Sequence, residues 1–154
     1  MRLYLVRHGM AKSKEEDPER PLNERGISET KRVAAFLAPL KLTVDTIYHS
    51  GKARSRETAE IIAGVIASAG GVKQRDGINP DDEVKKFAKE IAKARTDIMI
   101  AGHQPFLGKL ASYLLAQDQE AEVVSFSLSG VMCLDLGEEG WWHLLWMVVP
   151  EILP

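Results

Sequence analysis

The sequence predicts an α/β protein: a three-layer sandwich with a mainly parallel sheet, helices on both faces and an antiparallel C-terminal hairpin. Short apolar runs typical of strands alternate with segments whose apolar residues recur every three or four positions. The last two apolar runs, VMCLDL and WWHLLWMVV, flank the turn sequence GEEG and predict the hairpin. With 154 residues, of which 45% are apolar, the chain suits one domain, which we expect to span residues 1–154.

The first half of the chain supplies two predicted strand–helix pairs. LYLV, at positions 3–6, is an uninterrupted apolar run of the kind found in buried strands. The apolar spacing over residues 26–40 predicts the first crossover helix. VDTIYHS, residues 44–50, predicts a second strand, and a helix over residues 53–69 follows, closed by the glycine pair at 70–71.

The second half continues the alternation after a loop. Residues 70–82 are rich in Gly, Asn, Asp and Pro, so they predict a loop with a short strand at 72–75. Helical spacing returns over residues 84–92, and DIMIAG, residues 97–102, is a compact apolar strand. A further helical pattern over residues 107–115 precedes the hairpin.

Composition excludes several classes of function. Lys and Arg total 20 and Asp and Glu total 22, a formal net charge of -2, so the chain has no basic surplus for binding nucleic acid. No apolar stretch approaches the length of a membrane span, and the first ten residues lack a signal peptide. We therefore expect a cytoplasmic protein with no nucleic-acid or membrane partner. The single cysteine, Cys133, cannot form an internal disulfide and is expected to be a buried structural thiol.

Three predicted strands end in residues that can bind an anion. Arg7 and His8 end the first strand, and His49 ends the second, shortly before Arg54 in the following helix. His103 follows the DIMIAG strand. In open α/β sheets, ligands bind at the carboxyl ends of the strands, so we expect these side chains to gather there. Guanidinium groups, helix N-termini and adjacent glycines together favour a pocket for a phosphoryl group.

Other phosphate and metal chemistries fit the sequence poorly. GHQPFLGKL resembles a P-loop but has five residues between its glycines, and Leu110 replaces the required Ser or Thr. Cys133 is followed by LDLGEEG, which has no arginine to hold a phosphate, so a cysteine nucleophile is not indicated. No histidine pair has the spacing of a helical metal site. We expect neither a metal nor another cofactor.

The motifs LVRHGM, SGKARSRET and GHQP resemble the three signatures of the histidine phosphatase superfamily, which has the phosphoglycerate-mutase-like fold. RPLNERG, residues 20–26, and the small size resemble the SixA branch of bacterial phosphohistidine phosphatases. The resemblance extends from the first strand to the C-terminal hairpin. It implies a single histidine-phosphatase domain and a hydrolase that acts in signal transduction.

The resemblance also implies roles for individual residues. His8 would be the nucleophile that becomes a phosphohistidine, while Arg7, Arg54 and His103 would hold the non-bridging phosphate oxygens. These roles agree with phosphoryl transfer, which depends mainly on positioning and on stabilising equatorial charge. Arg20 would bind substrate if the charged loop KSKEEDPER folds over the pocket. The alternative for Arg20 is a solvated loop.

Three positions depart from the family pattern without removing a proposed catalytic group. Met10 stands where many relatives have an acidic residue, Gly51 where proline is usual, and Asn23 where Thr or Ser often precedes the helix. Asn23 and Ser50 can still cap local backbone groups.

A general acid is the main feature that the sequence does not provide. Larger members of the superfamily carry an insertion with a glutamate that protonates the leaving alcohol, whereas this chain has only GINPDDEV in that region. The candidates there are Asp81, Asp82 and Glu83. Their other interpretation is the start of a helix, whose dipole favours carboxylates.

The missing acid favours a phosphorylated imidazole as the substrate. A sugar alkoxide is a poor leaving group without a proton donor, whereas a phosphorylated imidazole departs as a neutral ring with a conjugate-acid pKa of about 6.5. We therefore expect a phosphatase for phosphohistidine on a protein. The alternatives are a phosphatase for a small phosphorylated metabolite and a non-catalytic module that recognises phosphate. Trp141 and Trp142 in the hairpin are open to two interpretations, a partner-binding patch or edge-strand packing.

Overall fold

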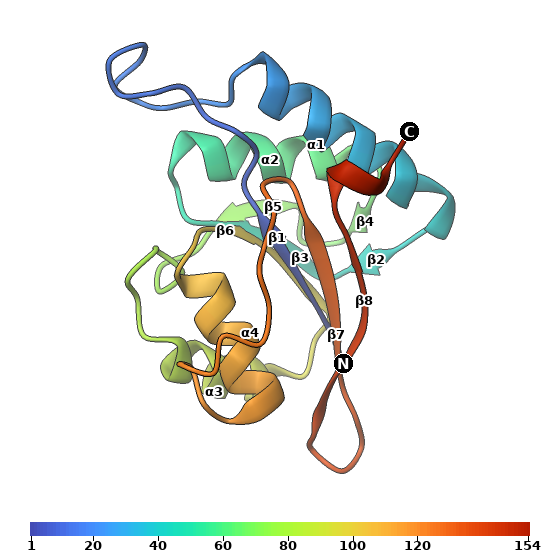
Figure 1. Ribbon diagram of the computed structural model, residues 1–154. Coiled ribbons are helices and arrows are strands. Elements are labelled where there is room, and N and C mark those ends of the chain that lie inside the picture. Colours follow the sequence, from blue (N-terminus) through green and yellow to red (C-terminus); the bar gives the residue numbers. More distant parts are fainter.

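A computed structural model describes all 154 residues and forms a six-stranded sheet between two pairs of helices (Figure 1). In sheet order the strands are β5 (Val72–Gln74), β3 (Thr46–His49), β6 (Ile98–Gly102), β1 (Arg2–Arg7), β7 (Val131–Leu136) and β8 (Trp142–Val148). The first four strands are parallel to one another, β7 runs antiparallel to β1, and β8 runs antiparallel to β7. The predicted fold class is confirmed.

Strand β1 lies inside the sheet and is buried on both faces. It pairs in parallel with β6 and antiparallel with β7. Leu3 and Leu5 point into one hydrophobic core, whereas Tyr4 and Val6 point into the other. This double burial explains why positions 3–6 of the strand are all apolar or aromatic instead of alternating with polar residues.

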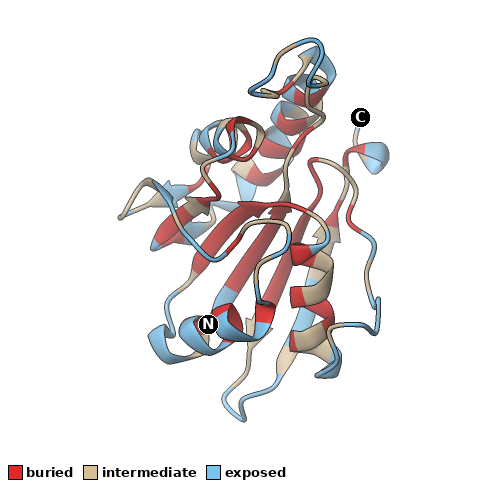
Figure 2. Ribbon diagram, turned by 90° about the vertical axis from the view of Figure 1, so that its left-hand side faces the viewer, coloured by how far each residue is buried: buried red, intermediate tan, exposed pale blue.

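Each face of the sheet is covered by two helices. Helices α3 (Val84–Ala94) and α4 (Phe106–Ala116) pack together on one face, and α1 (Glu24–Leu37) and α2 (Ala53–Ala63) on the other. The central strands are buried, and the exposed residues lie mainly on the outer surfaces of the helices, in the loops and on the edge strand β8 (Figure 2). None of the four α-helices has the length and apolarity that a membrane span requires.

The predicted helix over residues 53–69 is too long. Helix α2 ends at Ala63, and Ala67–Ser68 instead form β4, which pairs in parallel with β2 (Thr43–Val44) in a separate small sheet. Gly64 has low helix propensity, and two β-branched residues follow it, so the helix terminates there. The apolar spacing misled because Ile66 is buried in the same core as the helix although it lies outside it.

The predicted strand over residues 44–50 is divided in two. Asp45 separates β2 from β3, and its backbone N–H donates to the Asp97 carbonyl over 2.7 Å. The first helix also differs from the predicted 26–40, because it begins at Glu24 and ends at Leu37. Beyond Leu37, the segment Ala38–Leu40 is a 3₁₀ turn (η1) with Pro39 near its start, and a second such turn, η2 (Pro150–Ile152), follows β8.

The loop between β1 and α1 is anchored to the helices. Asn23 caps α1, because its side chain accepts the Gly26 N–H over 2.8 Å, as the sequence suggested. The Asn23 N–H donates to the Met10 carbonyl, and the Leu22 N–H donates to the Glu57 carboxylate over 2.7 Å. These bonds hold the base of the loop, whose tip extends away from the sheet, in blue at the upper left of Figure 1.

Gly26 allows the first turn of α1 to contact the loop backbone. A methyl group at this position would overlap the backbone of Met10. We expect Gly26→Ala to lower the free energy of unfolding by about 2 kcal/mol, because relief of the overlap requires a backbone shift. Urea denaturation measures the change. Gly137→Ala is the control, since a methyl there meets only ordinary contacts of 3.5 Å or more. Equal stability of the two variants would contradict this role of Gly26.

Candidate active site

A cavity of about 370 Å³ opens at the carboxyl ends of β1 and β6. Its walls contain Arg7, His8, Met10, Ala11, Arg20, Arg54, Pro80, His103, Gln104 and Leu128. All five predicted site residues are among them, although they come from separate segments of the chain. No Asp or Glu side chain lines this cavity.

Strand pairing brings the two histidines together. Arg7 and Gly102 are partners in the β1–β6 ladder, and the His8 N–H extends it by donating to the Gly102 carbonyl over 3.0 Å. His8 and His103 therefore leave neighbouring strands side by side, with 5.1 Å between their ring centroids. On the other side of β1, the Ser129 N–H donates to the Arg7 carbonyl over 3.1 Å and fixes the strand end.

The hydrogen bond of His8 determines which nitrogen faces the cavity. Nδ1 lies 2.7 Å from the Gly9 carbonyl oxygen, which can only accept, so Nδ1 carries the proton. Burial is the main cause that lowers the pKa of His8 to about 4; the charges of Arg54, Arg7 and Arg20 act in the same direction, and the Gly9 bond opposes them. His8 is therefore neutral at pH 7 and keeps a free lone pair on Nε2.

His103 is almost fully buried, with 1% of its surface exposed. Its Nε2 lies 2.6 Å from the Ser50 hydroxyl, and its Nδ1 has no partner in the chain. Burial lowers the pKa of His103 to about 3, helped by the nearby His8 and Arg54. When the Ser50 hydroxyl donates to Nε2, the single proton of the neutral ring lies on Nδ1, which leaves an unused donor.

Two arginines add unpaired donors to the cavity. Arg7 donates from Nη1 to the Phe126 carbonyl over 2.6 Å, but its Nε has no partner, and neither has the Nε of Arg54. Burial lowers the pKa of both guanidinium groups, and Arg20 lowers that of Arg54 further. Buried donors without acceptors are rare in proteins, so these atoms indicate a site for an anion.

Arg20 reaches the cavity from the loop after β1. Its backbone is left-handed, with φ of 50°, and its Nε donates to the Lys12 carbonyl over 3.1 Å. The guanidinium is thereby held in the cavity wall and is not left in a solvated loop.

The remaining candidates lie outside the cavity. Asp81, Asp82 and Glu83 are not in its walls, and Asp82 accepts the Asn79 N–H over 2.7 Å to close a turn before α3. His49 is buried behind the site, where its Nδ1 accepts the Gly51 N–H over 3.0 Å. Trp141 is 57% exposed beside the β7–β8 turn, which lies near the amino end of β1, where Arg2 pairs with Asp135.

Buried hydroxyl groups behind the site hold the strand ends in place, a feature that the sequence did not predict. Ser55 accepts the Ser50 N–H over 3.1 Å and donates to the Ala101 carbonyl over 2.7 Å, which joins α2 to two strand ends. Thr58 donates to the Arg54 carbonyl and accepts the Gly9 N–H over 3.0 Å. Short polar residues at positions 55 and 58, on the same helical face as Ala59, were the available signal.

Potential metal ligands are dispersed over the chain, and the single cysteine is buried. Nowhere in the chain do three His, Cys, Asp or Glu side chains lie close enough together to hold a metal ion. Cys133 is free and fully buried in β7, and burial raises the pKa of its thiol.

Comparison with known proteins identifies relatives of the sequence and of the fold. Residues 3–79 match the family model described as histidine phosphatase superfamily, branch 1. An uncharacterised protein of Picosynechococcus is 33% identical over 145 residues, which cover 89% of this chain and 86% of that protein.

Solved structures with the same fold include phosphatases of two kinds. The protein histidine phosphatase SixA complexed with tungstate superposes with a TM-score of 0.83 over 97% of both chains, at 21% identity. The alpha-ribazole phosphatase from Shigella flexneri superposes with a TM-score of 0.75 over 94% of both chains, at 17% identity. The phosphoglycerate-mutase-like architecture expected from the motifs is thereby confirmed.

The lowered pKa of His8 predicts how stability depends on pH. Between pH 6.5 and about 4, the unfolded chain binds a proton at this ring that the folded chain does not. Stability is therefore unaffected by His8 above pH 6.5 and falls as the pH decreases toward 4. From pH 7 to pH 5, His8 alone should reduce the free energy of unfolding by about 2 kcal/mol.

Urea denaturation at both pH values tests this linkage. The difference in stability between pH 7 and pH 5 should be smaller in His8→Asn than in the wild type, and His143→Asn, at an exposed position on β8, is the control. The same difference in His8→Asn and the wild type would contradict a neutral, partly buried His8.

Proposed function

The chain belongs to the histidine phosphatase superfamily, and we propose that it is a phosphatase that hydrolyses phosphohistidine on a protein. The observation that carries the proposal is the composition of the cavity wall, which holds five cationic or imidazole side chains and no carboxyl group. Such a site can bind and accept a phosphoryl group but offers no acid to protonate a leaving group.

Binding of the phosphoryl group would use the unpaired donors. Arg7, Arg54 and His103 each hold a buried nitrogen that lacks an acceptor. In the proposed complex these nitrogens donate to the non-bridging oxygens, and Arg20 closes the mouth of the cavity. The charge that develops on these oxygens during transfer is then stabilised by groups that are already in place.

In the first chemical step, Nε2 of His8 would attack phosphorus. Its lone pair forms the new N–P bond, and the bond from phosphorus to the substrate imidazole breaks, so that electron pair returns to the substrate ring. That ring carries a proton on its other nitrogen and departs as neutral imidazole. The Nδ1–H of His8 stays bonded to the Gly9 carbonyl and supports the positive charge of the phosphorylated ring.

In the second step, a water oxygen would attack phosphorus and displace His8. The electron pair of the P–N bond returns to Nε2, and because Nδ1 has kept its proton the ring again becomes neutral. One water proton passes to a phosphate oxygen or to solvent. Both leaving groups are imidazoles, so neither step requires an external acid.

A phosphatase for a small phosphate ester is the second candidate, because the alpha-ribazole phosphatase shares the fold. An ester leaving group would require a proton from solvent or from the substrate itself. A non-catalytic module that only recognises phosphate is less consistent with the site, since phosphate binding does not need an unprotonated Nε2 among the cationic donors.

Trapping the phosphoenzyme tests the nucleophile. After brief incubation with phosphoramidate and an alkaline quench, mass spectrometry should detect an acid-labile phosphoryl group on His8. The His8→Ala variant should lose both the label and turnover, because no other side chain presents a free imidazole nitrogen at this position. His49→Asn, which alters a buried histidine outside the cavity, is the control for the fold. A label on another residue of the wild type would overturn the assignment.

Leaving-group preference distinguishes the two candidate substrates. Because a general acid contributes about 10²–10⁴-fold, we expect kcat/KM for a phosphohistidine peptide to exceed that for a sugar phosphate by about a hundredfold or more. Initial rates of phosphate release under matched conditions measure the ratio. Higher kcat/KM on the sugar ester would instead select the metabolite phosphatase.

A further inference from the structure

A second cavity, of about 400 Å³, opens beside the candidate active site and shares Arg20 and Arg54 with it. Its other charged side chains are Lys14, Lys52, Arg56 and Glu19. Five cations therefore face one carboxylate in this cavity, although the whole chain has a net charge of -2. We call this cavity the basic groove.

The cations of the basic groove act against the helix on which they lie. Lys52 is the N-cap of α2, Arg54 and Arg56 follow within its first turns, and the first turn has no acidic residue. The positive end of a helix dipole favours carboxylates and disfavours cations. The N-cap also forms no side-chain hydrogen bond. A local arrangement that disfavours the helix is typical of a functional surface.

Partners within the chain leave most of this charge unneutralised. Arg56 lies 3.8 Å from Glu60, a loose pair whose members are 47% and 57% exposed. Lys14 and Lys52 take part in none of the ion pairs of the chain. Their charges are therefore available to a ligand.

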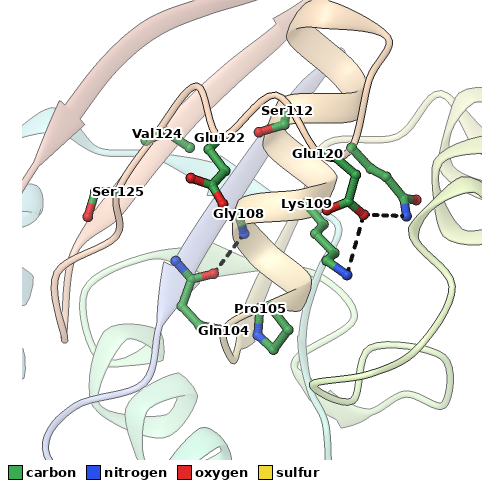
Figure 3. A pocket seen from close by; sticks show the side chains of 10 residues that line it. Gln104, Pro105, Gly108, Lys109, Ser112, Glu120, Glu122, Val124 and Ser125 are labelled. Atoms are coloured by element: carbon green, nitrogen blue, oxygen red, sulfur yellow. Dashed lines mark hydrogen bonds and ion pairs between the residues drawn. The ribbon is translucent and has the colours of Figure 1, made fainter.

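The opposite side of the active site carries carboxylates and has no surplus of positive charge. A cavity of about 350 Å³ extends there along α4 and the loop after it, and Gln104 belongs both to it and to the active site (Figure 3). Lys109 in this cavity pairs with Glu120 over 3.6 Å, and Glu122 adds a second carboxylate. Anionic groups flanking a bound phosphoryl group would therefore be attracted to the α2 side only.

We propose that the basic groove docks acidic residues of the phosphoprotein substrate beside its phosphohistidine. The proposal rests on the proposed function and names the partner surface: carboxylates that flank the phosphorylated histidine. Lys14, Lys52 and Arg56 are exposed and come from two separate segments, an arrangement that suits several carboxylates on a protein surface. A second phosphate of a small ester would be better matched by buried donors like those of the active site itself.

Exposed cations of this kind act mainly on association. They raise the rate at which an acidic surface meets the site, and at 0.1 M salt their attraction is largely screened beyond about 10 Å. Lys14, Lys52 and Arg56 would therefore select among phosphoproteins without taking part in phosphoryl transfer.

Kinetics with matched peptides tests the proposal. Three substrates are compared: a phosphohistidine peptide flanked by glutamates, the same peptide flanked by glutamines, and phosphoramidate, which has no flanks. We expect the wild type to favour the acidic peptide by about tenfold in kcat/KM, and this preference to diminish as salt is added. The triple variant Lys14→Ala/Lys52→Ala/Arg56→Ala should lose the preference and retain wild-type turnover of phosphoramidate.

A second triple variant controls for net charge. Lys86→Ala/Lys89→Ala/Lys93→Ala removes three exposed lysines from α3, so it should keep the preference for acidic flanks. Thermal denaturation verifies that both variants are folded. Equal loss of the preference in both variants would overturn the proposal, and so would an equal fall in peptide and phosphoramidate turnover in the groove variant.

A binding measurement with peptides distinguishes a failure of the basic-groove proposal from a failure of the proposed function. Fluorescence anisotropy with peptides that carry phosphotriazolylalanine, a hydrolysis-resistant phosphohistidine analogue, reports docking without turnover. Hydrolysis of phosphohistidine peptides with no dependence on their flanks would overturn the groove and leave the function standing. Groove-dependent binding of the acidic analogue without hydrolysis of any phosphohistidine peptide would support the groove and overturn the function. A groove-dependent gain in kcat/KM that is limited to small bisphosphates would overturn the proposal that the basic groove docks acidic residues of a protein.

Discussion

Three buried nitrogens without acceptors, on Arg7, Arg54 and His103, are the constraint on which the site depends. A buried polar group that lacks a partner costs about 1–3 kcal/mol, more when it is charged. The fold must therefore hold these side chains in place although their unpaired nitrogens would gain hydrogen bonds to water if they were exposed. It does so by placing Arg7 at the end of a strand buried on both faces and His103 at the end of its neighbour. A bound tetrahedral anion would satisfy all three donors at once.

The rigidity of the site comes from short hydroxyl side chains more than from ion pairs. The ion pairs of the chain lie elsewhere, mostly between exposed groups that contribute little to stability. Ser55 and Thr58 instead connect α2 to the ends of β1, β3 and β6, and Ser50 fixes the ring of His103. These bonds are buried and join segments that are remote in the sequence, so they position the guanidinium and imidazole groups without neutralising them.

The electrostatics of the site support the substrate proposed above. In the proposed reaction, a neutral nucleophile, a wall of cations and a neutral leaving group form a set in which no proton has to be supplied during transfer. The same surplus of positive charge continues outward over the start of α2, where it disfavours the helix locally. Binding of phosphate and attraction of acidic flanking residues would thus use one continuous positive surface, divided between a buried part and an exposed part.

The sequence by itself determined the fold class and the identity of the central side chains. The continuous apolar run of β1 reports burial on both faces, and a cation and a histidine directly after such a run indicate a strand end with a function. It could not place the end of α2, because Ile62 and Ile66 show the same apolar spacing although only Ile62 is helical. Periodicity records which face is buried and not whether the backbone remains helical.

Only the tertiary structure decided the properties that depend on distances between remote segments. The free nitrogen of His8 follows from one carbonyl oxygen, and Nε2 of His103 contacts the hydroxyl of Ser50, which lies 53 residues away in the chain. The basic groove likewise joins Lys14 in a loop to Lys52 at the start of a helix. A sequence lists donors and charges in order along the chain, but their partners are set by which strand ends and helix starts the fold brings within a few ångströms.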